Sequence, residues 1–134
     1  MRRWCRKAWD AGGTVADVTL DELVVRLREF AAVRAWERFH TPKNLAMALA
    51  GEVGELVAEL QWLTPEEAEQ VMADPEAAAR MRAELADVTI YLVRLADVLG
   101  VDLIEAARVK LMESDRRYDV ETYHGSTRKA PPLS

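Results

Sequence analysis

The sequence predicts an all-α fold in which four main helices pack as a bundle, and three observations support this prediction. Apolar residues recur at the three- and four-residue spacing of helices, and no stretch shows the alternation of a strand. Glycine and proline are sparse, and three of the five prolines directly follow a threonine or an aspartate, which is typical of helix starts. No internal repeat divides the 134 residues, so we expect a single bundle domain.

The first predicted helix follows a stretch that has no helical period. Residues 1–18 contain a Gly-Gly pair, and we expect them to form a loosely ordered N-terminal arm. Thr19 and Glu22 then make a capping-box pattern, in which each side chain can bond the backbone of the other residue. This pattern and the apolar period after it predict a helix that runs to about Phe39.

Four more capping patterns predict the remaining helices. The expected helices run from residue 42 to about 62, from 65 as a short helix, from 75 to 99, and from 103 to about 117. Gly100 ends the long helix, and Asp102 with Glu105 makes a further capping box. We therefore assign residues 19–119 to the helical domain and residues 120–134 to a polar C-terminal tail.

Composition argues against several classes of protein. The net charge of −5 argues against a general nucleic-acid binder, although free nucleotides stay open as ligands. Cys5 is the sole cysteine, so the chain has neither an internal disulfide nor a cysteine-based zinc site. No apolar run has the length of a signal peptide or a membrane span, and we expect a cytoplasmic protein.

Two pairs of acids carry the functional signal. Glu52 pairs with Glu55, and Glu84 pairs with Asp87, each at a spacing of three residues that places both side chains on one helix face. Both faces are otherwise apolar, so the acids are expected to point partly inward. Glycines on both sides of Glu52 indicate close helix approach or room for a ligand.

A divalent cation explains inward-facing acids best. Carboxylates are rarely buried unless they are paired or bind a metal, and four facing acids would repel one another without a cation between them. Oxygen ligands without Cys or His favour Mg²⁺ or Mn²⁺ over zinc. The alternative is an ordinary solvated helix face, and two such pairs on apolar faces make that interpretation the weaker one.

Aromatic and polar residues near the helix ends suggest contacts to a nucleotide. Trp36, His40 and Trp62 are expected to lie together near one end, where they could sandwich a planar base, and Tyr91 lies one turn after Asp87. Phosphate contacts could come from Asn44, Lys110, Arg117, Arg128 and Lys129, although such residues are usually just solvated.

The acidic motifs resemble those of a known family. Glu52-Val-Gly-Glu55, followed by Glu84-Leu-Ala-Asp87, is similar to the Glu-x-x-Glu and Glu-x-x-Asp motifs of the all-α nucleoside triphosphate pyrophosphatases, the MazG and dimeric dUTPase superfamily. Within it, residues 30–62 and the run ELADVTIYLVRLA resemble the MazG-like dCTP pyrophosphatases. The resemblance spans roughly residues 19–129.

The resemblance implies a MazG-like four-helix fold and an activity. The implied reaction is Mg²⁺-dependent hydrolysis of the α–β phosphoanhydride of a deoxynucleotide, with dCTP or a modified dCTP favoured, to the monophosphate and pyrophosphate in nucleotide-pool sanitation. Glu52, Glu55, Glu84 and Asp87 would be the catalytic metal ligands, and Glu52 or Glu55 would orient the attacking water. The implied assembly is a homotetramer or a homodimer.

The resemblance also implies substrate contacts. Trp36 and Trp62 would line the base pocket, and Tyr91 would pack on the sugar and favour deoxyribose. Lys110, Arg117 and Tyr118, with Arg128 and Lys129, match positions in similar register. Leu27 and Ser114 depart from the histidine and asparagine that many relatives have, so the base preference and one phosphate or metal contact stay open.

Two other functions stay open at this point. One is a pyrophosphatase for another nucleotide, such as dUTP, a damaged or modified base, or phosphoribosyl-ATP. The other is a non-catalytic helical interaction module, which would explain the amphipathic helices but gives no reason for four inward-facing acids.

Overall fold

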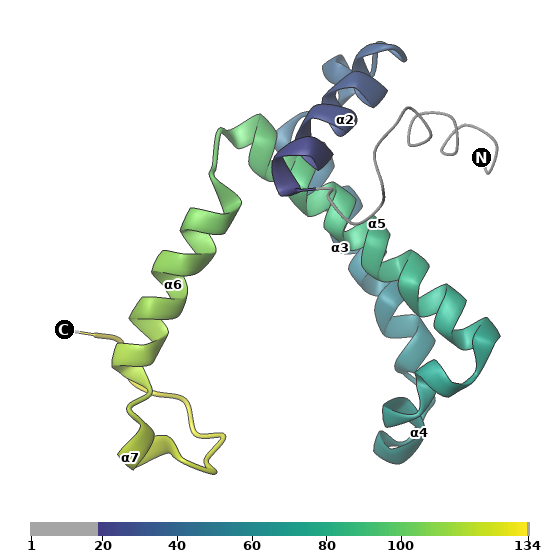
Figure 1. Cartoon of the computed structure of the whole chain (residues 1–134). Helices are drawn as coiled ribbons and strands as arrows, with labels where there is room; N and C mark the ends of the chain where they lie inside the picture. Colours follow the sequence, from purple (N-terminus) through teal and green to yellow (C-terminus); the bar gives the residue numbers. More distant parts are fainter. Residues whose placement is uncertain (1–18, 134) are drawn as a thin grey trace. The chain divides into compact units, whose positions relative to one another are not determined.

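The described part of the chain, residues 19–133 of a computed structural model, consists of helices, their connecting segments and a non-helical stretch after Tyr123 (Figure 1). No strand occurs in it, which confirms the all-α prediction. The predicted N-terminal arm, residues 1–18, lies outside the described residues. The chain divides after Leu99 into two units, and the boundary predicted at residues 119 and 120 stays a prediction. Over residues 19–133, no helix is both long and apolar enough to cross a membrane.

The first unit is organised by two long helices. α3 (Pro42–Leu60) and α5 (Pro75–Leu99) run side by side, joined by the short helices α4 (Pro65–Glu69) and η3 (Val71–Ala73) (Figure 1). They are antiparallel, because Glu59 near the end of α3 meets Arg80 near the start of α5. α2 (Leu20–Ala32) packs on α5. The buried apolar residues of this unit are Ala31, Leu45, Ala78, Met81, Val93 and Ala96.

The second unit contains α6 (Leu103–Arg117) and α7 (Val120–Tyr123). The predicted tail thus carries a four-residue helix, which is too short to show a period in the sequence. The Arg117 side chain donates hydrogen bonds to the carbonyl oxygens of Ala130, at 2.9 Å, and Pro131, at 3.1 Å. Ala130 is buried. Because the fourth main helix belongs to this unit, packing of all four as one bundle stays a prediction.

The capping residues predicted from the sequence are in place. The side chains of Thr19, Thr41 and Thr64 accept hydrogen bonds from backbone N–H groups at the starts of α2, α3 and α4. Asp102 does the same for α6, but Glu105 does not complete the predicted capping box. Its carboxylate instead binds Arg108 one turn later, with N–O distances of 2.7 Å.

The first helix is shorter than predicted. It ends at Ala32 rather than near Phe39, and η2 (Glu37–Phe39) follows as a separate turn. Ala35 has a positive φ of 52°. The N–H of Trp36 binds the carbonyl of Ala31, and the N–H of Ala35 binds that of Ala32, both at 3.0 Å. These two bonds form a Schellman motif, the usual helix stop, which the sequence conceals because alanine stands where glycine is usual.

Packing of two aromatic rings completes this stop. The Phe30 ring meets the Trp36 ring edge to face, with centroids 5.7 Å apart. An apolar contact across the stop is common in Schellman motifs. This contact between Phe30 and Trp36 offsets part of the free-energy cost of the left-handed conformation of Ala35.

We expect Ala35→Gly to stabilise the protein. A left-handed conformation costs an alanine about 1–2 kcal/mol and costs glycine little, while glycine loses about 0.5–1 kcal/mol more backbone entropy on folding. The net gain in the free energy of unfolding should be up to about 1 kcal/mol. Thermal unfolding would measure it, with Ala32→Gly inside α2 as the control that should destabilise. A destabilised A35G protein would contradict the left-handed assignment.

Candidate functional site

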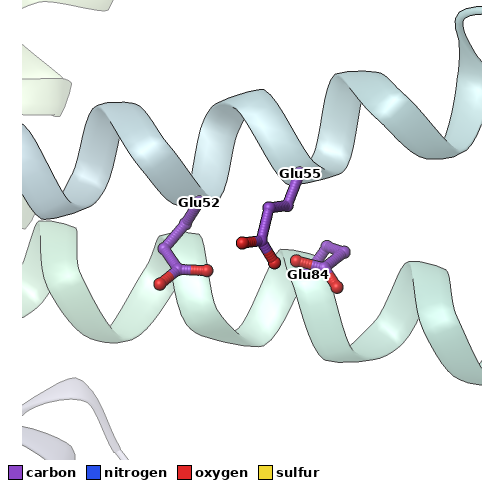
Figure 2. A group of neighbouring side chains, drawn as sticks. All are labelled: Glu52, Glu55 and Glu84. Carbon is purple, nitrogen blue, oxygen red and sulfur yellow. The ribbon is translucent and has the colours of Figure 1, made fainter.

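Three glutamates meet between the two long helices. Glu52 and Glu55 extend from α3, and Glu84 extends from α5 towards them (Figure 2). One carboxylate oxygen of each residue lies within 4.8 Å of the corresponding oxygens of the other two. The three-residue spacing on α3 places Glu52 and Glu55 one turn apart, and the antiparallel packing of α5 brings Glu84 opposite them. The structure therefore brings together three of the four predicted acids.

Within residues 19–133, no positive charge lowers the pKa of Glu52 or of Glu84. Burial raises the pKa of Glu52, and the charges of Asp87, Glu55 and Glu84 raise it further. Burial also raises the pKa of Glu84, followed by the charges of Glu55, Asp87 and Glu59. The Oε2 atom of Glu84 is buried and has no hydrogen-bond partner among the described residues. A buried carboxylate oxygen without a partner is costly, so this atom fits an ion in the group.

Asp87 and Glu59 surround the three-glutamate group without belonging to it. Asp87 lies one turn after Glu84 on α5, is half-buried, and acts on Glu52 and Glu84 through its charge. Glu59, one turn after Glu55, was not predicted as a site residue. Its carboxylate accepts a hydrogen bond from Arg80 Nε at 2.8 Å, which partly neutralises it. Its four-residue spacing from Glu55 was the sequence signal that could have identified it.

The glycines beside Glu52 leave open space. A Cβ atom added to Gly51 or Gly54 would meet nothing within 4 Å. The sequence analysis offered two explanations for these glycines. Close approach of another helix is wrong for the described residues of one chain. Room for a ligand beside the acids stays a prediction.

The predicted aromatic residues divide between the two ends of α3. Trp36 and His40 precede the helix, and their rings lie 6.4 Å apart. Trp62 follows the helix, and 86% of its surface is exposed. α3 spans about 27 Å at 1.5 Å per residue. Trp62 therefore cannot enclose a base together with Trp36 and His40 of the same chain, which corrects the expectation that the three lie near one end.

Two polar candidates already have structural partners. The side-chain amide of Asn44 donates to the carbonyl of Phe39 at 3.0 Å and so holds the turn before α3. His40 Nδ1 accepts a hydrogen bond from Arg94 Nε at 3.1 Å. Tyr91 is half-buried on α5, one turn beyond Asp87, as its position in the sequence predicted.

The remaining candidates lie in the second unit. Lys110 pairs with Glu113 at 2.8 Å, and Arg117 binds the two carbonyls of the tail. The Tyr118 ring packs edge to face on the Tyr123 ring, with centroids 5.1 Å apart. Arg128 lies over the Tyr123 ring, and Lys129 is exposed. Their predicted contacts to a nucleotide stay predictions.

The histidines do not contribute to the acidic group. Each stands three residues after a glutamate, as Glu37 with His40 and Glu121 with His124, a spacing that di-iron bundles use. Yet Glu37 begins a 3-10 turn, and His124 follows the short helix α7. Among the described residues, the group that could hold a metal ion consists of glutamates alone. Such an oxygen-only donor set suits a hard divalent cation.

Comparisons with known proteins agree with this geometry. Residues 48–133 match the MazG-like family. The bovine (Bos taurus) protein named dCTP pyrophosphatase 1 is 43% identical over 118 residues, which cover 88% of this chain and 70% of that protein. The human (Homo sapiens) protein of the same name is 44% identical over 115 residues, covering 86% and 68%.

A solved structure agrees as well. The crystal structure of a pyrophosphatase from Archaeoglobus fulgidus is 36% identical and has a TM-score of 0.71. The match covers 81% of this chain and 99% of that one.

We expect the metal-free protein to lose stability as the pH rises from the ordinary glutamate pKa of 4.5 through the raised pKa values of Glu52 and Glu84. The folded state holds these protons more tightly than the unfolded state, so ionisation favours unfolding. Mg²⁺ should therefore raise Tm at pH 7.5 and less at pH 4.5, where carboxyls with a pKa above 4.5 are mostly protonated and bind it poorly.

Glu84→Gln tests the same group. The variant should be more stable than the wild type without metal at pH 7.5, because it removes one repelling charge, and should gain less from Mg²⁺. Glu66→Gln, at an exposed position on α4, is the matched control. A wild type whose Tm does not respond to Mg²⁺, Mn²⁺ or pH would contradict the metal assignment.

Proposed function

The chain belongs to the MazG-like family and is a nucleoside triphosphate pyrophosphohydrolase, and on this premise we propose that it cleaves dCTP or a modified dCTP between the α- and β-phosphates. The observation that carries the proposal is the group of Glu52, Glu55 and Glu84 between α3 and α5. The similarity to dCTP pyrophosphatases over most of the chain supports the choice of base. The products are the deoxynucleoside monophosphate and pyrophosphate, and the role is nucleotide-pool sanitation in the cytoplasm.

We propose Mg²⁺, with Mn²⁺ as its substitute, as the cation of this site. Glu52, Glu55 and Glu84 would hold it, with Asp87 as the fourth ligand. Bound there, the cation would neutralise the triphosphate and make a nearby water more acidic. Three neighbouring acids suit this task, because a divalent cation would relieve the repulsion that, after burial, raises the pKa of Glu52 and of Glu84.

The chain's own residues supply the positioning. Water attacks the α-phosphorus, and the bond to the oxygen that bridges the α- and β-phosphates breaks. Glu55 is the exposed member of the group, and Glu52 is half-buried, so either carboxylate can reach a water on the open side of α3 and accept its proton. Tyr91, one turn beyond Asp87 on α5, is placed to pack against the sugar.

We propose that two copies of the chain complete the base pocket. Trp36 and Trp62 lie at opposite ends of a helix about 27 Å long, so both can contact one base only if they come from different subunits. The exposed apolar side chains of the two long helices support assembly; they are Met47, Val53, Val57, Leu85 and Leu92. A homodimer meets this requirement, and a homotetramer built from two dimers meets it too.

A different nucleotide is the main alternative. dUTP or another non-standard nucleotide would use the same acids and the same reaction, and only the base contacts would differ. The non-catalytic module is the weaker alternative, because an interaction surface gives no reason for Glu84 Oε2 to be buried without a partner.

Pyrophosphate release tests the activity. We expect Mg²⁺-dependent release from dCTP and 5-methyl-dCTP, faster than from dUTP, dTTP, CTP or ATP, with the monophosphate as co-product. Glu55→Gln and Asp87→Asn should lower kcat by at least about 100-fold and keep the helical fold, because each removes a charge that stabilises the transition state. Glu66→Gln should leave the rate unchanged. Fastest release from another nucleotide would overturn the base assignment alone.

Mixing two variants with weakened substrate binding tests the shared pocket. Trp36→Ala and Trp62→Ala should each raise KM, because stacking on an aromatic ring is worth about 1–3 kcal/mol per base. Refolding the two variants together should restore part of the activity, because a mixed pair contains one intact pocket. The control is the W36A/W62A double variant mixed with wild type, which contains the same total number of Trp36 and Trp62 side chains as the first mixture. No recovery in the mixture would show that Trp36 and Trp62 do not line one shared pocket.

A further inference from the structure

A buried charged network ties three segments of the first unit together. Arg94 on α5 and Asp97 one turn later have side chains that are only 10% and 7% exposed. Arg94 Nη1 lies 2.6 Å from Asp97 Oδ2. Arg28 on α2 also binds Asp97, with its Nε 3.0 and 3.1 Å from the two carboxylate oxygens. The hydrogen bond from Arg28, together with the charges of both arginines, lowers the pKa of Asp97 despite its burial. The carboxylate therefore stays ionised and anchors Arg94.

Arg94 determines which nitrogen of His40 carries the proton. Arg94 Nε lies 3.1 Å from His40 Nδ1, and a guanidinium can only donate hydrogen bonds. Nδ1 must therefore present its lone pair, and the proton of a neutral imidazole must be on Nε2.

His40 is also kept neutral. Burial and the positive charge of Arg94 lower its pKa, against a smaller opposite effect from Glu37. Near neutral pH, the His40 side chain therefore donates a hydrogen bond through Nε2 and accepts one through Nδ1. Within residues 19–133 no acceptor binds Nε2, so this donor is left for another molecule.

The donor lies beside an aromatic surface. The His40 ring is 6.4 Å from the Trp36 ring, which is 40% exposed and braced edge to face by Phe30. A planar base on Trp36 would present its edge near His40. Cytosine has a hydrogen-bond acceptor at N3, whereas uracil and thymine carry a hydrogen there that would oppose an N–H donor. The O2 acceptor is common to all three bases and would not distinguish them.

We propose that Arg94 is a positioning residue that fixes His40 as an Nε2–H donor, and that this donor selects bases whose ring N3 is a hydrogen-bond acceptor. This inference rests on the proposed function for its second half. The first half concerns the protein alone and is tested without any nucleotide.

Nitrogen NMR of the imidazole tests the first half. The chain has only two histidines, so His124→Gln leaves the signals of His40 alone. We expect one protonated and one unprotonated ring nitrogen in this protein between pH 6.5 and 8. Arg94→Met in the same background should add the other tautomer, and Arg94→Lys, which can still donate, should restore the first. An unchanged spectrum in R94M would overturn the positioning role.

Loss of Arg94 leaves Asp97 with Arg28 alone, so the Tm of each variant is measured first. If R94M does not fold, R94M/D97N removes both buried partners and leaves only Arg28, whose side chain is 61% exposed. Arg108→Met is the matched control, because Arg108 makes an exposed ion pair on α6 and should change neither the spectrum nor the kinetics.

Kinetics test the second half. R94M should raise KM for dCTP about three- to tenfold, leave kcat unchanged, and lower the ratio of kcat/KM for dCTP to that for dUTP by the same factor, as expected for one misplaced hydrogen bond. A changed tautomer with an unchanged ratio would overturn base selection by His40. If the wild type cleaves no nucleotide, the proposed function and this half fail together, while the spectrum still decides the role of Arg94.

Discussion

Antiparallel packing of α3 on α5 is the constraint on which the rest of the first unit depends. It creates three levels of contact along the helix pair. Glu59 meets Arg80 near the connecting turn, the acidic group lies in the middle, and His40 meets Arg94 at the far end. The outer levels are attractive and the middle level is repulsive. Apolar packing and the two outer contacts therefore hold together a pair of helices whose centre favours separation.

The sequence predicted most of this arrangement because its signals were local. Thr19, Thr41 and Thr64 cap helices where expected, and the three-residue spacing of Glu52 and Glu55 placed both acids on the face that meets α5. Pairing of that face with Glu84 could be anticipated because both faces are apolar around the acids. The caps and the shared face of Glu52 and Glu55 depend on residues within one turn of each other, so spacing alone describes them.

Features that depend on distant residues could not be predicted in the same way. The early end of α2 depends on a left-handed Ala35, a conformation that sequence patterns reserve for glycine. The separation of Trp36 from Trp62, in contrast, already followed from the helix predicted over residues 42 to about 62, which α3 confirms. The network of Arg28, Asp97 and Arg94 joins residues 69 positions apart, and arginine and aspartate on a helix are usually solvated.

The hydrogen bonds of Arg117 to the C-terminal segment affect which substitutions this protein can accept in evolution. Arg117 binds the carbonyl oxygens of residues 130 and 131, which every amino acid provides. Substitutions at Pro131 therefore leave the acceptor in place, whereas buried Ala130 admits only small side chains. Selection to keep the C-terminal segment bound to α6 would then act on Arg117 and on the small residue Ala130. The stretch from 118 to 129 could accept substitutions, insertions and deletions, while the hydrogen bonds from Arg117 to residues 130 and 131 keep its two ends together.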